Sequence, residues 1–178
     1  AWDKAEDIEW EKLPNRFAIK CNHGCGYNLI CQDKTKFDTK KAEEQLNAWM
    51  KDDFWKEYAE VHYKKIPKKI ICEKYLEGKG NALPVDFKIY CFNGKPQFLY
   101  ISKVLEDHET ASIDFITLDW EKALFYRDDY KRFETLPEKP RKFNEMLGVC
   151  TKLSEGIPFV RVDLYEIDGQ IKFSELTF

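Results

Sequence analysis

Runs of apolar and β-branched residues with polar positions between them recur along the chain and predict strands. The first two runs, 17–22 and 27–32, are joined by the tight segment His23-Gly24-Cys25-Gly26, which is typical of a hairpin. Six later runs predict further strands at 70–76, 85–92, 97–104, 113–118, 159–166 and 171–178. Strands therefore outnumber helices in the predicted fold.

Two segments show the helical period instead. Apolar residues recur at roughly this period over 39–58, and Asp38 is placed to cap the N-terminus of that helix. A second helix is predicted over 141–154, with Gly156 just beyond its end. Asn93-Gly94 and Asp168-Gly169 lie between strands and predict tight hairpins. We therefore expect an α+β fold with mainly antiparallel sheets.

The composition fits a folded domain. Of the 178 residues, 43% are hydrophobic and 34% are charged, and the net charge of -3 gives no general attraction to nucleic acid. No apolar run reaches the ~20 residues of a membrane span, and no signal peptide opens the chain. We expect a cytoplasmic protein whose six cysteines are reduced.

The first candidate site is Lys20, which lies in an apolar strand just before the glycine-containing loop 22–26. A lysine there can bind a phosphate while backbone N–H groups of the loop contact the same oxygens. An ordinary hairpin whose lysine reaches solvent explains the pattern equally well. The alternating Cys21, His23 and Cys25 lack a second ligand pair, so the spacing argues against structural zinc.

Two further segments carry charged residues near strand ends. At the end of the run 70–77, backbone groups could pair with an adenine edge, and the carboxylate of Glu73 or Glu77 could accept ribose hydroxyls. Taken by itself, this segment is better explained by solvated charges at a strand end. Asp86 and Lys88 share one face of the next strand because side chains alternate. An ion pair on a solvent-exposed face is the alternative there.

The last two strands carry the strongest signal. A hairpin centred on Asp168-Gly169 brings Asp163 and Glu175 close together, and two such carboxylates repel unless a cation lies between them. Mg²⁺ binds carboxylates together with phosphate oxygens, and Arg161 beside it could stabilise charge on a reacting group. The alternative is a solvated polar face on which Arg161 neutralises Asp163, and we favour the metal site.

These segments, in this order, resemble the TupA-like ATP-grasp family, found in gene clusters for cell-wall and capsular polysaccharides. The segments that carry the resemblance are LPNRFAIKCNHGCG, KIICEKYLE, VDFKIYCFNGKPQF and PFVRVDLYEIDGQIKFSELTF. The resemblance implies one ATP-grasp domain over 1–178, with ATP held between an N-terminal lobe of about 14–72 and a C-terminal lobe of 73–178. It also implies a fragment, because family members usually have further residues before and after these segments.

The resemblance assigns roles to particular residues. The phosphates are expected to contact Lys20, Asn22, His23, Gly24, Cys25 and Gly26. The rest of the nucleotide is expected to contact Glu73, Lys74, Tyr75, Leu76, Glu77, Asp86 and Lys88. Asp163 and Glu175 are the expected Mg²⁺ ligands, and Lys20 and Arg161 the expected catalytic cations. Cys25 stands where the family often has serine, and Thr177 where many superfamily members have asparagine.

The function that the resemblance implies is that of an ATP- and Mg²⁺-dependent carboxylate–amine ligase in cell-surface polysaccharide biosynthesis. Such enzymes activate a carboxylate as an acyl-phosphate, and its partners here would be a carboxylate and an amine or a sugar-polymer acceptor. One alternative is a glycosyltransferase-type biosynthesis protein. The other is a non-catalytic nucleotide-binding module without an acceptor site.

Overall fold

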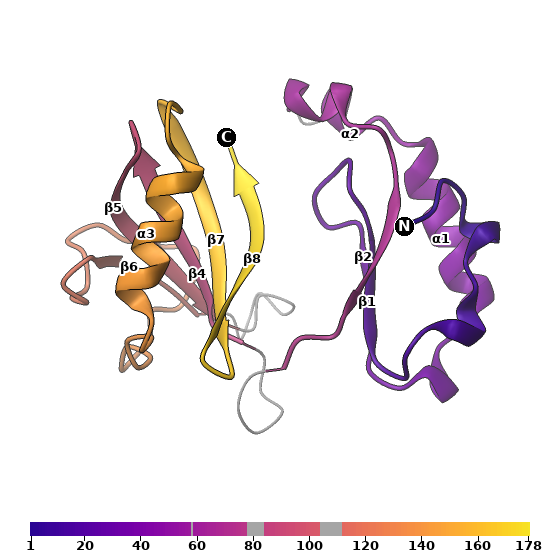
Figure 1. Cartoon of the computed structure of the whole chain (residues 1–178), viewed down its shortest axis with the longest axis horizontal. Helices are drawn as coiled ribbons and strands as arrows, with labels where there is room; N and C mark the ends of the chain where they lie inside the picture. The colour runs from indigo at the N-terminus through magenta and orange to yellow at the C-terminus, as the bar shows by residue number, and fades with distance from the viewer. Residues whose placement is uncertain (58, 78–83, 104–111) are drawn as a thin grey trace. The chain divides into compact units, whose positions relative to one another are not determined.

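The computed structural model describes residues 1–57, 59–77, 84–103 and 112–178. The chain forms two compact units, Ala1–Tyr75 and Leu76–Phe178, here called unit 1 and unit 2 (Figure 1). Each unit has its own antiparallel sheet and its own hydrophobic core. Two antiparallel sheets with few helices confirm the predicted α+β fold.

Unit 1 is built on a three-stranded sheet in the order β2-β1-β3. Its strands are β1 (Phe17–Cys21), β2 (Asn28–Cys31) and β3 (Ile70–Lys74). Burial alternates along β1, so that Phe17, Ile19 and Cys21 enter the core while Lys20 lies on the opposite face. The same alternation that builds the core therefore places the candidate lysine outside it.

The core face of this sheet packs against the helix α1 (Thr39–Lys51), which contributes the fully buried Leu46. The carboxylate of Asp38 accepts a hydrogen bond from the Lys41 N–H, as the sequence predicts for an N-cap. The prediction of one helix over 39–58 was wrong, because α1 ends at Lys51 and a short α2 (Phe54–Glu57) follows. Residue 58 lies outside the described residues.

The break between α1 and α2 has a local cause. The side chain of Lys68 donates hydrogen bonds to the carbonyls of Met50 and Asp52, two of the groups that a helix leaves without partners at its C-terminus. The Asp52 carboxylate accepts the hydroxyl of Tyr27, and the backbone of Asp52 is extended. Tertiary partners therefore replace the helical hydrogen bonds that would have continued α1.

The N-terminal segment also belongs to unit 1. The backbone of Trp2 exchanges two hydrogen bonds with Ile70, and Ala5 and Ile8 are buried in the core. The short helical turns of this unit are η1 (Ala5–Asp7), η2 (Trp10–Lys12), η3 (Lys34–Lys36) and η4 (Val61–Lys65). The segment before β1 thus completes the core rather than extending from it.

Unit 2 is built on a five-stranded sheet in the order β6-β5-β4-β7-β8. Its strands are β4 (Asp86–Phe92), β5 (Lys95–Lys103), β6 (Ser112–Thr117), β7 (Phe159–Ile167) and β8 (Gln170–Thr177). Asn93, Gly94, Asp168 and Gly169 all have positive φ, as tight two-residue hairpins require. The hairpins predicted at Asn93-Gly94 and Asp168-Gly169 are confirmed. Residue 104 of the predicted strand 97–104 lies outside the described residues.

One face of this sheet is covered by α3 (Phe143–Leu153). The core between them consists of buried apolar residues from four strands and the helix: Phe87, Ile89, Cys91, Leu99, Ile101, Ile116, Phe143, Met146, Cys150, Val160, Val162 and Leu164. None of the six cysteines forms a disulfide. Because α3 takes the apolar face, the alternate residues of β4 and β7 lie on the other face.

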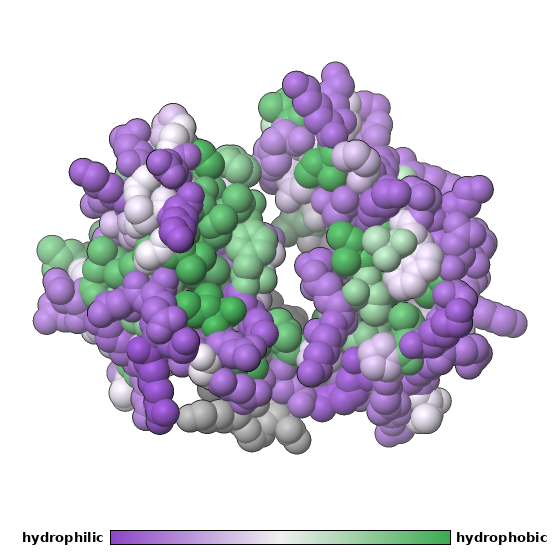
Figure 2. All heavy atoms as spheres, in the orientation of Figure 1, coloured by the Kyte–Doolittle hydropathy of each residue, from purple (hydrophilic) through white to green (hydrophobic). Residues whose placement is uncertain are grey.

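The two units differ in the hydropathy of the surface that is seen in Figure 2. Figure 2 shows hydrophilic residues over most of the visible face of unit 1 and a larger gathering of hydrophobic residues on unit 2. Exposed large hydrophobic residues of unit 2 include Phe92, Leu124, Phe125, Tyr126, Leu153, Phe159, Phe173 and Phe178. No helix within the described ranges is long and apolar enough to cross a membrane.

The packing of α1 predicts the effect of a core truncation. Leu46→Ala leaves a cavity in a fully buried position and should lower the free energy of unfolding by about 2–5 kcal/mol. Gln45→Ala, at an exposed position of the same helix, should change it by roughly 0.5 kcal/mol or less. Urea denaturation of both variants, followed by circular dichroism, measures the difference, and equal midpoints would contradict this packing.

Candidate functional site

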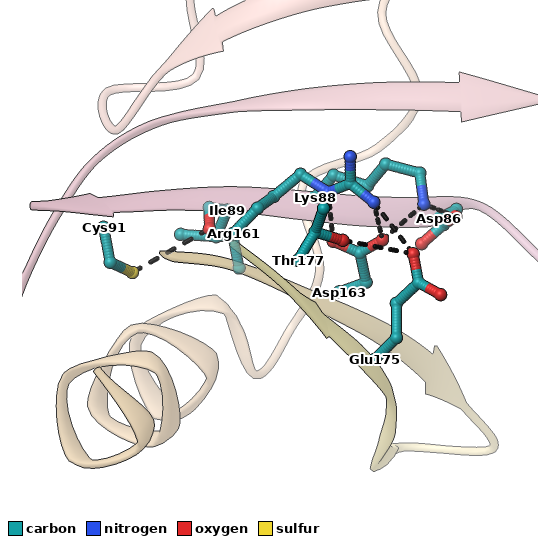
Figure 3. A network of polar contacts seen from close by, with 8 residues as sticks. All are labelled: Asp86, Lys88, Ile89, Cys91, Arg161, Asp163, Glu175 and Thr177. Carbon is teal, nitrogen blue, oxygen red and sulfur yellow. Dashed lines mark hydrogen bonds and ion pairs between the residues drawn. The ribbon is translucent and has the colours of Figure 1, made fainter. Parts of the chain in front are cut away.

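A cluster of charged residues lies on the face of the unit 2 sheet opposite α3 (Figure 3). Asp86 and Lys88 come from β4, Arg161 and Asp163 from β7, and Glu175 from β8. Lys88 is the cross-strand partner of Asp163, which in turn is the partner of Glu175. The pairing of three neighbouring strands therefore places a lysine and two carboxylates side by side.

The turn at Asp168-Gly169 and one irregularity set this register. Asp163 lies five residues before the turn pair and Glu175 six residues after it, so a regular hairpin would leave them out of register. The β7–β8 pairing shifts between Asp163 and Leu164, which absorbs the extra residue and makes Asp163 and Glu175 direct partners. The predicted proximity of the two carboxylates is confirmed.

Asp163 is fully buried, and two cations neutralise it. The Nε and Nη2 atoms of Arg161 donate to its Oδ1 and Oδ2 at 2.7 and 2.8 Å, a two-point contact, and Lys88 Nζ donates to Oδ2 at 2.5 Å. Charge-assisted, bidentate contacts of this kind are the strong ones in proteins. They allow an ionised carboxylate to remain at a position without solvent.

Lys88 also contacts Asp86, at 2.6 Å, and its side chain is only 9% exposed. Burial alone would lower the pKa of Lys88, but the attraction of Asp86 and Asp163 outweighs it, so its pKa is raised above the ordinary value. Burial raises the pKa of Asp86, whose Oδ1 has no hydrogen-bond partner within the described part of the chain. Asp86, Asp163 and Glu175 together exceed the two cations by one negative charge when all are ionised.

Arg161 lies between the two carboxylates that the sequence assigns to a metal. Its Nη2 donates to Glu175 Oε1 at 2.9 Å, in addition to its contacts with Asp163. The bonds to Asp163 overcome the effect of burial and raise the pKa of Arg161. Repulsion between the carboxylates is thus relieved by the guanidinium, so this repulsion by itself no longer requires a metal ion.

The donor set nevertheless has the chemistry of a Mg²⁺ site. Carboxylate oxygens are the ligands that Mg²⁺ prefers, and the cluster brings three carboxylates together with two cations. Glu175 is 54% exposed and therefore accessible to an ion from solvent. In the described ranges no three His, Cys, Asp or Glu side chains form a ready-made metal site.

In unit 1, Lys20 extends from β1 on the face opposite the core and forms an ion pair with Glu73 of β3, at 2.8 Å. Both side chains are partly exposed, so solvent weakens this pair. The counter-charge that a lysine in an apolar strand needs is therefore present within unit 1. Both partners are residues that the family resemblance assigns to the nucleotide.

The loop after Lys20 is held by its first two side chains. Asn22 donates from Nδ2 to the Pro67 carbonyl and accepts the Lys69 N–H at Oδ1. The buried His23 forms a hydrogen bond through Nε2 with the carbonyl of Trp49, at 2.8 Å. These two side chains hold the loop in place, and of the two only His23 is buried.

The tip of the loop is Gly24-Cys25-Gly26. A Cβ at Gly24 would lie 2.5 Å from the ring of Tyr27, and Gly26 has a φ of +76°, so glycine is required at both positions for different reasons. Cys25 is exposed. Among the described residues, no hydrogen bond uses the N–H groups of Cys25 or Gly26. Two backbone donors are thus available at the tip.

The remaining candidates lie where the two units join along the chain. Lys74 is an exposed residue at the end of β3, and the guanidinium of Arg16 lies 4.5 Å from the ring centre of Tyr75. Leu76 and Glu77 begin unit 2 and are half-buried. The structure therefore gathers the candidates into a group in each unit and a short connecting segment.

The model of one family, described as TupA-like ATPgrasp, matches residues 1–178. The chain belongs to this family. No curated protein matches it. Among solved structures, D-alanine–D-alanine ligase from Bacillus anthracis in complex with ATP has a TM-score of 0.45 and 16% identity, covering 96% of this chain and 44% of the ligase. A second structure of that ligase has a TM-score of 0.42 and 18% identity, covering 95% and 45%. The chain thus spans less than half of each ligase.

For this TupA-like ATP-grasp chain, sequence reasoning missed Tyr100 of β5. The ring centre of Tyr100 lies 5.9 Å from Lys88 Nζ and 6.0 Å from the guanidinium carbon of Arg161. Tyr100 becomes the cross-strand partner of Lys88 through a register shift between Tyr90 and Cys91, which the Asn93-Gly94 turn by itself does not specify. Burial raises its pKa, which keeps the ring neutral beside the two cations.

The buried charge of Asp163 predicts an unequal response to mutation. Asp163→Asn leaves Lys88 and Arg161 without their shared counter-charge and should lower the free energy of unfolding of unit 2 by about 3–5 kcal/mol. Glu175→Gln removes a half-exposed partner and should cost only about 0–1 kcal/mol. Hydrogen exchange of the β7 and β8 amides reports both values, and similar protection in the two variants would contradict the assignment.

The buried His23 predicts a pH dependence. Burial is the main cause that lowers its pKa below the ordinary 6.5, so the unfolded chain binds the proton more readily than the folded one. Its stabilising contribution is present above pH 6.5 and is lost as the pH falls from there through the folded-state pKa. In His23→Gln, stability should fall less than in wild type between about pH 7 and pH 5. Urea denaturation across this range tests it, and parallel curves would be the contrary result.

Proposed function

We propose that this chain binds ATP with Mg²⁺ and contributes to a carboxylate–amine ligase that acts through an acyl-phosphate. The observation that carries the proposal is the cluster of two cations and three carboxylates fixed on one face of the unit 2 sheet. Phosphoryl transfer depends on positioning and on neutralising charge. A chain of the TupA-like ATP-grasp family with such a cluster is suited to that task.

In unit 2, Asp163 and Glu175 would hold the metal ion. Mg²⁺ supplies a charge that binds and neutralises phosphate oxygens. Lys88 would hold the carboxylate of Asp163 in place, since it donates to that carboxylate from a buried position. Arg161 would stabilise negative charge on the transferring phosphoryl group or on the acyl-phosphate. Each role uses a charge that is present in the folded unit.

In unit 1, Lys20 would contact the phosphates together with the N–H groups of Cys25 and Gly26. The free donors at the loop tip support this role, and Asn22 and His23 would act by holding the loop. A phosphate would compete with Glu73 for Lys20. Because that pair is half-exposed, such an exchange costs little.

The segment from Glu73 to Glu77 would contact the adenine and the ribose, with Asp86 as a second candidate for the ribose. The Oδ1 atom of Asp86 is buried and has no hydrogen-bond partner among the described residues, so it could still accept a hydroxyl. Lys74, Tyr75 and Leu76 belong to the same segment.

In the overall reaction a carboxylate oxygen attacks the γ-phosphorus and ADP leaves. An amine then attacks the acyl carbon, and phosphate leaves. The family resemblance supports a substrate in cell-surface polysaccharide biosynthesis.

ATP titration with and without Mg²⁺, measured by calorimetry, tests the nucleotide site. Lys20→Ala should weaken ATP binding about tenfold or more, because a charge-assisted contact to phosphate is lost. Lys36→Ala, at an exposed position of unit 1, is the matched control and should bind like wild type. Equal or absent ATP binding in wild type and Lys20→Ala would refute the role of Lys20.

Turnover assays separate the ligase from its alternatives. A panel of small carboxylic acids and amines, supplied with ATP and Mg²⁺, should give ADP only when a matching carboxylate is present. Turnover of a nucleotide-sugar without ATP would favour the glycosyltransferase and contradict the ligase. ATP binding without ADP release across the panel would favour a non-catalytic nucleotide-binding module.

A further inference from the structure

The two cations that neutralise Asp163 are held differently. Lys88 is 9% exposed and contacts two carboxylates that are themselves buried or nearly so, Asp86 and Asp163. The side chain of Arg161 is 18% exposed, and its second partner, Glu175, is 54% exposed. One cation is therefore enclosed by unit 2, and the other joins the buried carboxylate to the solvent-exposed one.

We propose that Arg161 is an exchangeable counter-cation, which leaves Asp163 and Glu175 when a divalent ion binds there, while Lys88 remains in place. This inference rests on the proposed metal site and adds a division of roles between the two cations. Arg161 in this account stabilises the protein when no ion is bound. It is released toward the reacting phosphates only once the ion has taken its place.

Arg161 already occupies oxygens of both carboxylates. Both oxygens of Asp163 accept from Arg161, and Oε1 of Glu175 accepts from Arg161 and, at 3.3 Å, from the Thr177 hydroxyl. An ion liganded by the same two carboxylates would share with Arg161 the oxygens to which its guanidinium donates. Two positive charges sharing these oxygens would also repel each other at close range. Binding of the ion would therefore weaken the contacts that hold Arg161 in this position.

Lys88 is poorly placed for the same exchange. If its ammonium left, Asp86 and Asp163 would lose a buried counter-charge that no solvent replaces. The ring of Tyr100 also lies beside it. Arg161 can move at lower cost, because it has a half-exposed partner and its charge can reach solvent. The difference in burial thus decides which of the two cations leaves its carboxylate partners when the ion binds.

The test measures the affinity for Mn²⁺ alone, with free Mn²⁺ followed by electron paramagnetic resonance and no nucleotide present. Arg161→Gln removes the competing cation and should bind Mn²⁺ about tenfold or more tightly than wild type. Lys142→Gln removes one positive charge from an exposed pair with Glu145 at the start of α3, and should bind like wild type. Lys88→Met removes a charge beside Asp163 but leaves Arg161, so its gain should be clearly smaller.

The outcomes separate this inference from the proposed function. Wild-type binding of Mn²⁺ with no gain in Arg161→Gln, or an equal gain in Lys88→Met, would overturn the exchange and leave the metal site standing. Absence of binding in wild type and in Arg161→Gln would overturn both.

A second measurement needs no variant and covers a possible loss of folding. The Nε–H nuclear magnetic resonance signal of Arg161 in the wild-type chain should show slow exchange with water without metal, because Nε donates to Asp163. Saturating Mg²⁺, which is diamagnetic, should shift this signal and speed its exchange. A signal that Mg²⁺ leaves unchanged, under conditions where Mn²⁺ binds, would overturn the inference.

Discussion

The carboxylate of Asp163, fully buried in the sheet of unit 2, is the constraint on which the candidate site depends. A charge at such a position is tolerated only with counter-charges and hydrogen bonds close by. Lys88 and Arg161 supply both, and each brings a further carboxylate, Asp86 or Glu175, into the cluster. The residues that stabilise Asp163 are therefore the same residues that we propose to take part in binding the metal ion and the phosphate groups.

The strand alternation that creates the core also creates this cluster. In β7 the apolar Val162 and Leu164 pack with α3, and the residues next to them, Arg161 and Asp163, lie on the other face. Unit 1 repeats the principle at Lys20, which alternates with core residues of β1 and is held by Glu73. In both units a cation proposed to bind phosphate, or to support its transfer, is paired with a protein carboxylate. Ligand binding in this account is an exchange of ion pairs.

The sequence predicted what local patterns determine. Both hairpins follow from residues that accept positive φ, and the nearness of Asp163 and Glu175 follows from the turn between them. The end of α1 was not predictable, because it depends on Lys68, which comes from a distant segment. The contact of Lys88 with Asp163 was missed for the same reason: β4 and β7 are neighbours only through a long-range pairing that no local pattern encodes. The roles of the candidate residues toward ATP stay predictions.

The most direct test of the central claim is a crystal structure of this chain with a non-hydrolysable ATP analogue and Mg²⁺. The account predicts one Mg²⁺ liganded by Asp163 and Glu175 and by phosphate oxygens, with Lys88 still against Asp163 and the guanidinium of Arg161 moved off both carboxylates. A bound nucleotide whose Mg²⁺ lies away from Asp163 and Glu175, with Arg161 still joining them, would contradict it.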